Sequence, residues 1–327
     1  MKALNSFQTN VFQINNQNFD QHALELFIFQ YKNNSIYRDY VQYIQVNPFE
    51  VNEVSKIPCL PIQFFKSHQV KSGDFVPEHV FESSGTTGTT SKHYIQNLHF
   101  YQKISSQIFQ TFFGPIHHSI VVGLLPSYLE RDNSSLVYMV NHFIEESHNQ
   151  QSGFYLNNQN TLKQNLELMD QNGLPIFLFG VTFALLEFAE KYMLDAKNLH
   201  IIETGGMKGR GRELIREELH QKLKSAFHTD HVFSEYGMTE LLSQAYLLND
   251  GLFHTPPWMR VMIRDIHDPF SLVENGKTGG INVIDLANVH SCAFIETEDL
   301  GMARPGGFNV LGRHDNSDLR GCNLLLS

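Results

Sequence analysis

Apolar side chains recur at helical spacing in several stretches of the chain. One set between residues 98 and 114 lies three or four positions apart: Leu98, Tyr101, Ile104, Ile108 and Phe112. This spacing places the set on one face of a helix that stops at Gly114. The segments 19–34, 181–194 and 210–227 show the same period and predict three further helices.

Short continuous apolar runs alternate with these helices. They occupy residues 119–127, 174–180, 198–206 and 230–240. Buried strands that alternate with helices indicate an α/β fold with a mostly parallel sheet. Ligands of such sheets bind beyond the carboxyl ends of the strands. The polar or glycine-rich stretches "LLPSYLER", "ETGG" and "SEYGMTE" all fall at such ends.

The two ends of the chain show other patterns. "IPCLPIQFFKSHQV" (57–70) contains two prolines and predicts an extended linker. Short alternating strands with glycine turns predict a smaller β-rich part at about 251–314. We therefore expect one large domain over residues 1–314 and a short C-terminal tail over 315–327, without a clean linker inside the large domain.

Composition narrows the classes of protein. The net charge of −10 argues against non-specific binding to nucleic acid or to anionic membranes. Three cysteines among 327 residues argue against a disulfide framework. The polar start lacks the apolar core of a signal peptide, and no apolar run is long enough to span a membrane. A cytoplasmic globular protein is expected.

The stretch "FESSGTTGTTSK" (81–92) contains almost no apolar residue. Because strand-like segments flank it, a hairpin loop is predicted. The stretch lacks the second glycine of a Walker P-loop, and a strand rather than a helix follows. A surface turn is the simplest interpretation. However, consecutive amides, hydroxyls and Lys92 would also suit a phosphate group.

These residues resemble the phosphate-binding motif of the adenylate-forming acyl and aryl ligases, roughly S-[ST]-G-[ST]-T-G-x-[PS]-K. In that family the loop lies between two strands and holds the phosphates of ATP. The resemblance implies that the lysine is Lys92 and that the following residues surround the phosphates: Ser83, Ser84, Gly85, Thr86, Thr87, Gly88 and Thr89.

Four further segments resemble motifs of the same family, in the family's order. "ETGG" resembles the strand end beside the adenine pocket, which implies roles for Gly205 and Gly206. "SEYGMTE" is similar to the Y-G-x-T-E motif. The resemblance implies that Tyr236 stacks on adenine next to Gly237, that Thr239 bonds a phosphate oxygen and that Glu240 ligates Mg²⁺. Each of these residues alone would fit an ordinary structural role.

The third and fourth segments lie in the last part of the chain. "TEDL" is similar to the family's T-G-D-L, with Glu298 in place of glycine, and implies that Asp299 binds the ribose. "GRHD" resembles the hinge motif and implies a ribose contact for Arg313. Together the motifs imply ATP-dependent conversion of a carboxylic acid to an acyl-AMP. This chemistry needs positioning and charge neutralisation more than covalent help from the protein.

Most of these ligases continue past the hinge motif into a small second domain. In this sequence too few residues follow Arg313 to form such a domain. The acyl-protein synthetases of bacterial bioluminescence (LuxE-like) form a branch of the family with short chains. The segment "IPCLPIQFFK" also resembles the N-terminal part of this branch. In that branch a cysteine near the C-terminus captures the acyl group, which implies this role for Cys322. Cys322 follows Arg313 by nine residues, a maximum reach of ~30 Å. The alternative is an idle thiol.

We therefore expect an acyl-protein synthetase that uses ATP and Mg²⁺ and takes a carboxylic acid, with a fatty acid favoured. An acyl-accepting protein (a reductase, a carrier or an acyltransferase) is the expected partner, without nucleic acid and without stable membrane insertion. Two alternatives remain: direct transfer to coenzyme A or a carrier thiol, and a nucleotide-binding scaffold without catalysis.

Other candidate chemistry is weaker. Cys59 and Cys292, the latter in an expected strand, are predicted to be buried small apolar residues. The 17 histidines lack paired ligand spacing, so structural zinc is not expected. The aromatic residues of 178–192 could line an acyl tunnel, but an ordinary core helix is the favoured interpretation.

Overall fold

The computed structural model describes residues 7–84, 89–125, 133–155, 159–206 and 214–313. The chain forms two compact units. One comprises residues 77–251. The other combines residues 1–76 with residues 252–327. Each unit is described by itself.

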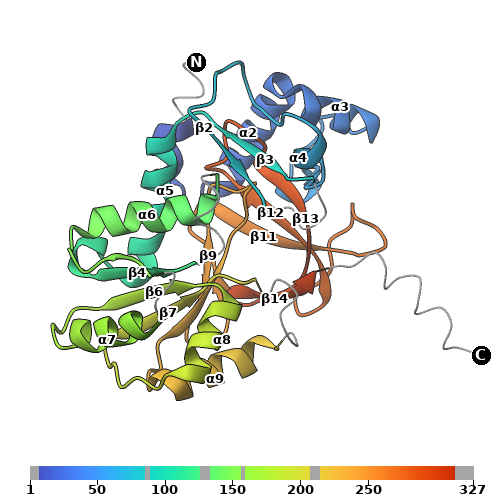
Figure 1. The fold of residues 1–327 in the computed structure, drawn as a ribbon. Helices are drawn as coiled ribbons and strands as arrows, with labels where there is room; N and C mark the ends of the chain where they lie inside the picture. The colour runs from blue at the N-terminus through green and yellow to red at the C-terminus, as the bar shows by residue number, and fades with distance from the viewer. Residues whose placement is uncertain (1–6, 85–88, 126–132, 156–158, 207–213, 314–327) are drawn as a thin grey trace, which may run out of the picture. The chain divides into compact units, whose positions relative to one another are not determined.

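The unit 77–251 is built on a sheet with the strand order β9-β8-β7-β6-β4-β5 (Figure 1). Its strands are β4 (Ile120–Leu124), β5 (Gly153–Phe154), β6 (Ile176–Gly180), β7 (Leu199–Glu203), β8 (Val232–Tyr236) and β9 (Ala245–Leu247). All neighbouring pairs are parallel except β8 with β9. The predicted α/β fold with a mostly parallel sheet is confirmed.

Helices cover both faces of this sheet. They are α5 (Leu98–Phe113), α6 (Ser135–Ser147), α7 (Gln159–Asp170), α8 (Thr182–Lys191) and α9 (Arg216–Phe227), with the 3-10 turn η3 (Ile116–His118). Phe109 of α5 contacts Phe143 of α6 and Phe177 of β6, with ring centroids 5.0 and 4.9 Å apart. On the other face, Phe188 of α8 packs on Phe227 of α9. Fully burying one such ring contributes about 1.5–3 kcal/mol.

The helix predicted after residue 98 is confirmed, including its end. The side chain of Asn97 accepts a hydrogen bond from the backbone N–H of Phe100 and caps the first turn. Gly114 then adopts φ 87°, a left-handed conformation that suits glycine. The helix predicted at 181–194 is likewise present as α8. Because Phe188 is fully buried, the core-helix interpretation holds for this residue.

The strands on either side of the Gly/Thr stretch form a separate antiparallel hairpin of β2 (His79–Glu82) and β3 (Lys92–Ile95). Phe81 is fully buried in β2 and packs against Tyr101 of α5, with centroids 5.0 Å apart. The predicted hairpin is therefore confirmed for its two strands.

The other unit contains an antiparallel sheet with the order β11-β12-β13-β14-β10. Its strands are β10 (Phe253–His254), β11 (Met259–Arg264), β12 (Thr278–Asp285), β13 (Phe294–Arg304) and β14 (Gly307–Arg313). Its helices are α2 (Phe19–Asn33), α3 (Ser35–Tyr43) and α4 (Phe64–Ser67), with the 3-10 turns η1 (Val11–Gln13) and η2 (Val54–Lys56). The predicted helix over 19–34 is thus present.

Helix α2 is bonded to the turn between β12 and β13. The amide of Gln30 donates to the carbonyls of Asn288 and Val289, and its oxygen accepts from the N–H of Ala293. All of these groups are buried, so they satisfy polar atoms that would otherwise cost free energy. The N-terminal helices therefore belong to the same unit as the C-terminal strands, which the sequence did not predict.

The prediction of an extended linker at 57–70 is wrong in part. Leu60 and Pro61 form strand β1 (Leu60–Pro61) beside β13, and a short helix, α4, follows. Leu60 is fully buried, and the hydroxyl of Tyr37 donates to the carbonyl of Pro58. The two prolines keep most of the segment out of a helix, as expected. The segment nevertheless packs on the sheet, because the apolar neighbours of the prolines are buried there.

Candidate active site

The base of the Gly/Thr loop is closed by two hydrogen bonds beyond the hairpin strands. The backbone N–H of Ser83 donates to the carbonyl of Ser91, and the N–H of Ser91 donates to the Ser83 hydroxyl. The Ser83 side chain therefore closes the base of the loop. Thr89 is exposed. The predicted residues Gly85, Thr86, Thr87 and Gly88 lie outside the described residues.

Lys92 is the first residue of β3 and lies opposite Glu82 in the hairpin. Its Nζ lies 3.4 Å from Glu82 Oε1, and the side chains are 48% and 33% exposed. Such a solvent-screened pair contributes little to stability. Lys92 therefore lies where the chain leaves the Gly/Thr loop and enters β3.

The segment Tyr236–Glu240 follows the carboxyl end of β8. Tyr236 is 7% and Glu240 is 5% exposed. The imidazole of His93, a buried residue of β3, contacts the carbonyl of Thr239 at 2.8 Å through Nδ1. Because a carbonyl only accepts, Nδ1 must carry the proton. His93 thus joins the hairpin to this segment, so two of the predicted motifs are in direct contact.

His93 was not among the predicted site residues. Its position, one residue after Lys92 on a strand, was the signal that could have identified it. Successive side chains on a strand point to opposite faces. If Lys92 is exposed, His93 must be turned inward, where only a bonded imidazole is stable.

Glu203, at the end of β7, is the centre of a buried network that organises the "ETGG" segment. It is 4% exposed. Oε1 accepts hydrogen bonds from the backbone N–H of Gly205, at 2.7 Å, and from the hydroxyl of Thr182 at the start of α8. Oε2 accepts from the hydroxyl of Ser234 in β8 at 3.0 Å. One carboxylate therefore connects β7, β8 and α8.

His220 of α9 extends this network. Its Nε2 lies 2.9 Å from the Ser234 hydroxyl. Since Ser234 gives its one proton to Glu203, Nε2 must be the donor to Ser234. Burial, with the nearby charges of Arg216 and Lys224, lowers the pKa of His220 to about 4. The imidazole is therefore neutral at physiological pH.

The two glycines that follow Glu203 require their residue type. Gly205 and Gly206 have φ 77° and 91°, a conformation that is unfavourable for residues with a Cβ. The carbonyl of Gly205 accepts from the N–H of Thr182 at 3.1 Å. The predicted glycines thus form a fixed turn at the carboxyl edge of the sheet, in the same unit as the Tyr236–Glu240 segment.

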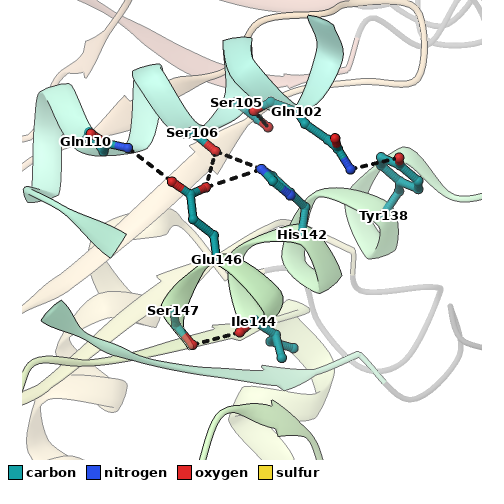
Figure 2. A network of polar contacts seen from close by, with 9 residues as sticks. All are labelled: Gln102, Ser105, Ser106, Gln110, Tyr138, His142, Ile144, Glu146 and Ser147. Atoms are coloured by element: carbon teal, nitrogen blue, oxygen red, sulfur yellow. Dashed lines mark hydrogen bonds and ion pairs between the residues drawn. The ribbon is translucent and has the colours of Figure 1, made fainter. Parts of the chain in front are cut away.

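A second polar network, shown in Figure 2, lies between α5 and α6. His142 Nε2 contacts both the Ser106 hydroxyl, at 2.9 Å, and Glu146 Oε2, at 3.2 Å. Ser106 also donates to Glu146. In a nucleophile triad the acid orients the imidazole through the nitrogen that does not face the hydroxyl. Here acid and hydroxyl share one nitrogen, so the arrangement joins two helices and does not activate Ser106.

Asp299 and Arg313 belong to the other unit. They are direct partners in the β13–β14 pairing, and Arg313 Nε lies 3.8 Å from Asp299 Oδ1. The backbone N–H of Asp299 donates to the hydroxyl of Thr297 at 3.1 Å. Asp299 is 16% and Arg313 is 82% exposed at the side chain. The two predicted ribose ligands are thus adjacent.

Two cysteines behave as predicted. Cys59 and Cys292 are free and buried, and burial raises the pKa of both thiols, that of Cys292 to about 12. Neither thiol therefore forms the reactive thiolate easily at neutral pH. Cys292 lies just before β13 and not within a strand, which corrects its predicted position. Cys322 lies outside the described residues.

Mg²⁺ and ATP are the groups that the motifs imply. Mg²⁺ is commonly held by one or two carboxylates together with phosphate oxygens and water. The buried carboxylate of Glu240, the residue after Thr239, suits such an ion. In the described part of the chain, no group of three or more His, Cys, Asp or Glu side chains could hold a metal by itself. The ion would therefore need the phosphates of ATP as further ligands.

Solved structures with the same fold are ligases. A 2-hydroxyisobutyryl-CoA ligase in complex with 2-HIB-AMP and CoA is 14% identical, with a TM-score of 0.67 over 94% of this chain and 71% of that one. ATP-bound MatB from Rhodopseudomonas palustris is 16% identical, with a TM-score of 0.54 over 72% of this chain and 47% of that one. The amide bond synthetase McbA from Marinactinospora thermotolerans is 15% identical, with a TM-score of 0.51 over 72% and 49%.

These similarities define the fold as that of the adenylate-forming ligases. The chain spans about half the length of MatB and McbA. A family model described as "Acyl-protein synthetase, LuxE" matches residues 11–327. The chain therefore belongs to the LuxE acyl-protein synthetase family. No curated protein matches it in sequence. No helix of the described residues is long and apolar enough to cross a membrane.

Proposed function

We propose that this protein uses ATP to activate a carboxylic acid, with a fatty acid favoured, as an acyl-AMP. The observation that carries the proposal is the contact between two motifs. The hairpin that bears the Gly/Thr loop and Lys92 is joined to the Tyr236–Glu240 segment through His93 and the Thr239 carbonyl, at 2.8 Å. The groups proposed to bind phosphate and the carboxylate proposed to bind Mg²⁺ therefore lie in one unit.

Each residue has a role that follows from its chemistry. The loop hydroxyls and amides would surround the phosphates of ATP, and Lys92 would offset their charge. Lys92 can leave Glu82 and pair with a phosphate by a movement of its side chain alone, because the lysine is half exposed. Glu240, with Thr239, would hold Mg²⁺, which neutralises phosphate charge when bound. We assign adenine to Tyr236 and the Gly205–Gly206 turn, and ribose to Asp299 and Arg313.

In the proposed step an oxygen of the substrate carboxylate attacks the α-phosphorus of ATP. The bond from that phosphorus to the bridging oxygen of the β-phosphate breaks, and pyrophosphate leaves with the electron pair. No proton has to be transferred, because both the nucleophile and the leaving group are anions. The protein therefore contributes alignment and charge stabilisation.

The test is ATP–pyrophosphate exchange with a panel of carboxylic acids. Exchange should require Mg²⁺ and an added acid. Lys92→Ala and Glu240→Gln should each slow it about 100-fold or more, which corresponds to about 3 kcal/mol of lost charge stabilisation. The matched control is Lys191→Ala, because Lys191 is also half exposed and pairs with a glutamate. Wild-type rates in either site variant would contradict the assignment.

We further propose that Cys322 captures the acyl group. Its thiolate would attack the acyl carbonyl of the acyl-AMP, the bond from that carbon to the phosphate oxygen would break, and AMP would leave. The resulting thioester would pass its acyl group to an accepting protein such as a reductase, a carrier or an acyltransferase. Support comes from membership of the family and from the nine-residue spacing to Arg313.

Intact mass and peptide mapping test this second step. With ATP, Mg²⁺ and an accepted acid, the protein should gain one acyl mass on Cys322, removable by neutral hydroxylamine. Cys322→Ser should abolish the label and keep pyrophosphate exchange, because adenylation precedes capture. Cys59→Ala should keep the label, since that thiol is buried. An acyl group found elsewhere, or none during active exchange, would favour direct transfer to coenzyme A or a carrier thiol.

A further inference from the structure

Three residues in or next to β8 and β9 place polar side chains on one face of the sheet. Glu235 and Tyr246 are direct partners in the antiparallel pairing. Gly237 lies two residues beyond Glu235, and Gln244 lies two residues before Tyr246. Because side chains alternate along strands, the Glu235, Gln244 and Tyr246 side chains share this face. We call these three side chains the β8–β9 cluster.

Two members of the cluster have polar atoms without the partners that buried polar groups normally have. Tyr246 is fully buried, and its hydroxyl has no hydrogen-bond partner in the described structure. Gln244 is 5% exposed. Its Nε2 donates to the carbonyl of Leu242, but its Oε1 is unpartnered among the described residues. Since most buried polar atoms are bonded, two such atoms on one face call for an explanation.

Glu235 adds a third polar group. Burial, followed by the charge of Glu203, raises the pKa of Glu235 to about 8. The carboxyl group is therefore mostly protonated at neutral pH and can donate as well as accept. Glu235 nevertheless keeps part of its surface accessible. The carboxyl group is therefore deep in the unit without being fully sealed from its surface.

Two of the three side chains, Glu235 and Gln244, meet beside Gly237. A Cβ on Gly237 would lie 2.2 Å from Glu235 Oε1 and 3.3 Å from Gln244 Cγ. The Glu235 carboxyl thus lies directly against the backbone of Gly237, next to Gln244. Any side chain at position 237 would displace it. Glycine here keeps the carboxyl on the strand that continues into Thr239 and Glu240.

Aromatic rings pack around Tyr246 of the cluster. Phe113 of α5 contacts Tyr246 and Phe233, with ring centroids 5.0 and 5.1 Å apart. Phe112 lies 5.8 Å from Tyr246. The Tyr246 hydroxyl is therefore carried by a ring that packs among apolar side chains of α5 and the sheet. A small number of directed polar groups in an apolar surrounding is the usual composition of a small-molecule site.

We infer that the β8–β9 cluster binds a hydroxyl group of the acid substrate, at a distance from its carboxylate. The inference rests on the proposed adenylation, whose groups at Tyr236–Glu240 follow Glu235 directly in the chain. A hydroxyl both donates and accepts. It can donate to Gln244 Oε1 and accept from the Tyr246 hydroxyl or the protonated Glu235. The substrate class is then a hydroxylated carboxylic acid.

The test measures preference within two pairs of acids, which distinguish the possible carbon skeletons. One pair is dodecanoate and ω-hydroxydodecanoate, and the other is cinnamate and para-hydroxycinnamate. Binding is measured by calorimetry without ATP, and turnover by pyrophosphate exchange. In at least one pair the hydroxylated acid should be preferred about tenfold or more, because a site with unpaired polar groups rejects the analogue that lacks the hydroxyl.

Tyr246→Phe removes only the unpartnered hydroxyl. Because that hydroxyl has no partner in the described structure, the variant should fold with unchanged or higher stability. The preference for the hydroxylated acid should fall several-fold or more. Tyr192→Phe, at the C-terminal end of α8, is the matched control and should keep the preference.

Equal binding of both members of each pair would overturn the inference, and so would an unchanged preference in Tyr246→Phe. Failure of the proposed function has a different signature. In that case no acid would support pyrophosphate exchange, while the hydroxylated acid would still bind preferentially and Tyr246→Phe would still lose that preference.

Discussion

Lys92 shows how one residue can serve two partners. In the structure its ammonium group pairs with Glu82 across the hairpin at 3.4 Å. In the proposed reaction it would bind a phosphate. The two interactions compete, because the group that pairs with Glu82 must leave it to reach a ligand. The pair is partly exposed, so water screens it and lowers the cost of this exchange.

This competition gives a prediction for Glu82→Gln. The variant removes the competing charge but keeps the size and the strand. We expect the KM for ATP to fall up to a few-fold, and the free energy of unfolding to change by less than about 1 kcal/mol. Steady-state exchange kinetics and urea denaturation measure the two quantities. A rise in KM would show that Glu82 positions the lysine for ATP instead of competing for it.

At the scale of elements, Glu203 holds together the carboxyl edge of the sheet. Its two oxygens accept from the start of α8, from the turn after β7 and from β8. These are the ends at which ligands of parallel sheets bind. The network therefore stabilises the unit and also fixes the Gly205–Gly206 turn.

Two substitutions of Glu203 should differ in their effect. Glu203→Ala leaves three donors without an acceptor, two of them buried, and should cost several kcal/mol, at about 1–3 kcal/mol for each unpaired buried group. Glu203→Gln can keep Oε1 and donate to Ser234, which then donates to a His220 of the other tautomer. It should cost about 1 kcal/mol. Urea denaturation measures both, and equal losses would show that the charge itself is what matters.

At the scale of the whole molecule, buried ionisable groups make stability depend on pH. Burial lowers the pKa of His200, His220 and His290 to about 4. The unfolded chain binds these protons near pH 6.5. Between pH 4 and 6.5 the unfolded state therefore holds more protons, and the free energy of unfolding falls as the pH is lowered.

Glu235 acts in the opposite direction. Its pKa of about 8 in the folded protein exceeds that of an unfolded glutamate, about 4.3. The folded state holds the extra proton between these values, so stability falls as the pH rises. Below pH 6.5 the three histidines change the free energy of unfolding more than the one glutamate does. Above pH 6.5 only Glu235 of these four groups still changes it. Maximum stability is therefore expected near pH ~6.5.

Urea denaturation at several pH values tests this prediction. From pH ~6.5 to ~8 the loss should reach at most about 2 kcal/mol, at about 1.4 kcal/mol per pH unit for one group. Glu235→Gln should remove the decline above pH ~6.5 and keep the decline toward acid. A decline above pH ~6.5 that persists in this variant would assign it to another group.

The sequence by itself determined the features that depend on neighbouring residues. The period of apolar residues after Leu98 predicted α5, because one helical face must be buried. Alternating strands and helices predicted the parallel sheet, since parallel strands need a crossover. Several short motifs in the family's order indicated the adenylate-forming fold. Cys59 and Cys292 were predicted as buried, because small apolar side chains flanked by apolar neighbours are usually inside.

Only the tertiary structure decided the features that depend on contacts between distant residues. The sequence assigned no role to Glu203, Ser234 or His220, because each becomes a network member only when β7, β8 and α9 pack together. The packing of segment 57–70 against β13 likewise depends on a strand more than 230 residues away. The unpartnered hydroxyl of Tyr246 is the clearest case. Hydrogen bonding of buried groups is set by three-dimensional neighbours, which no local pattern specifies.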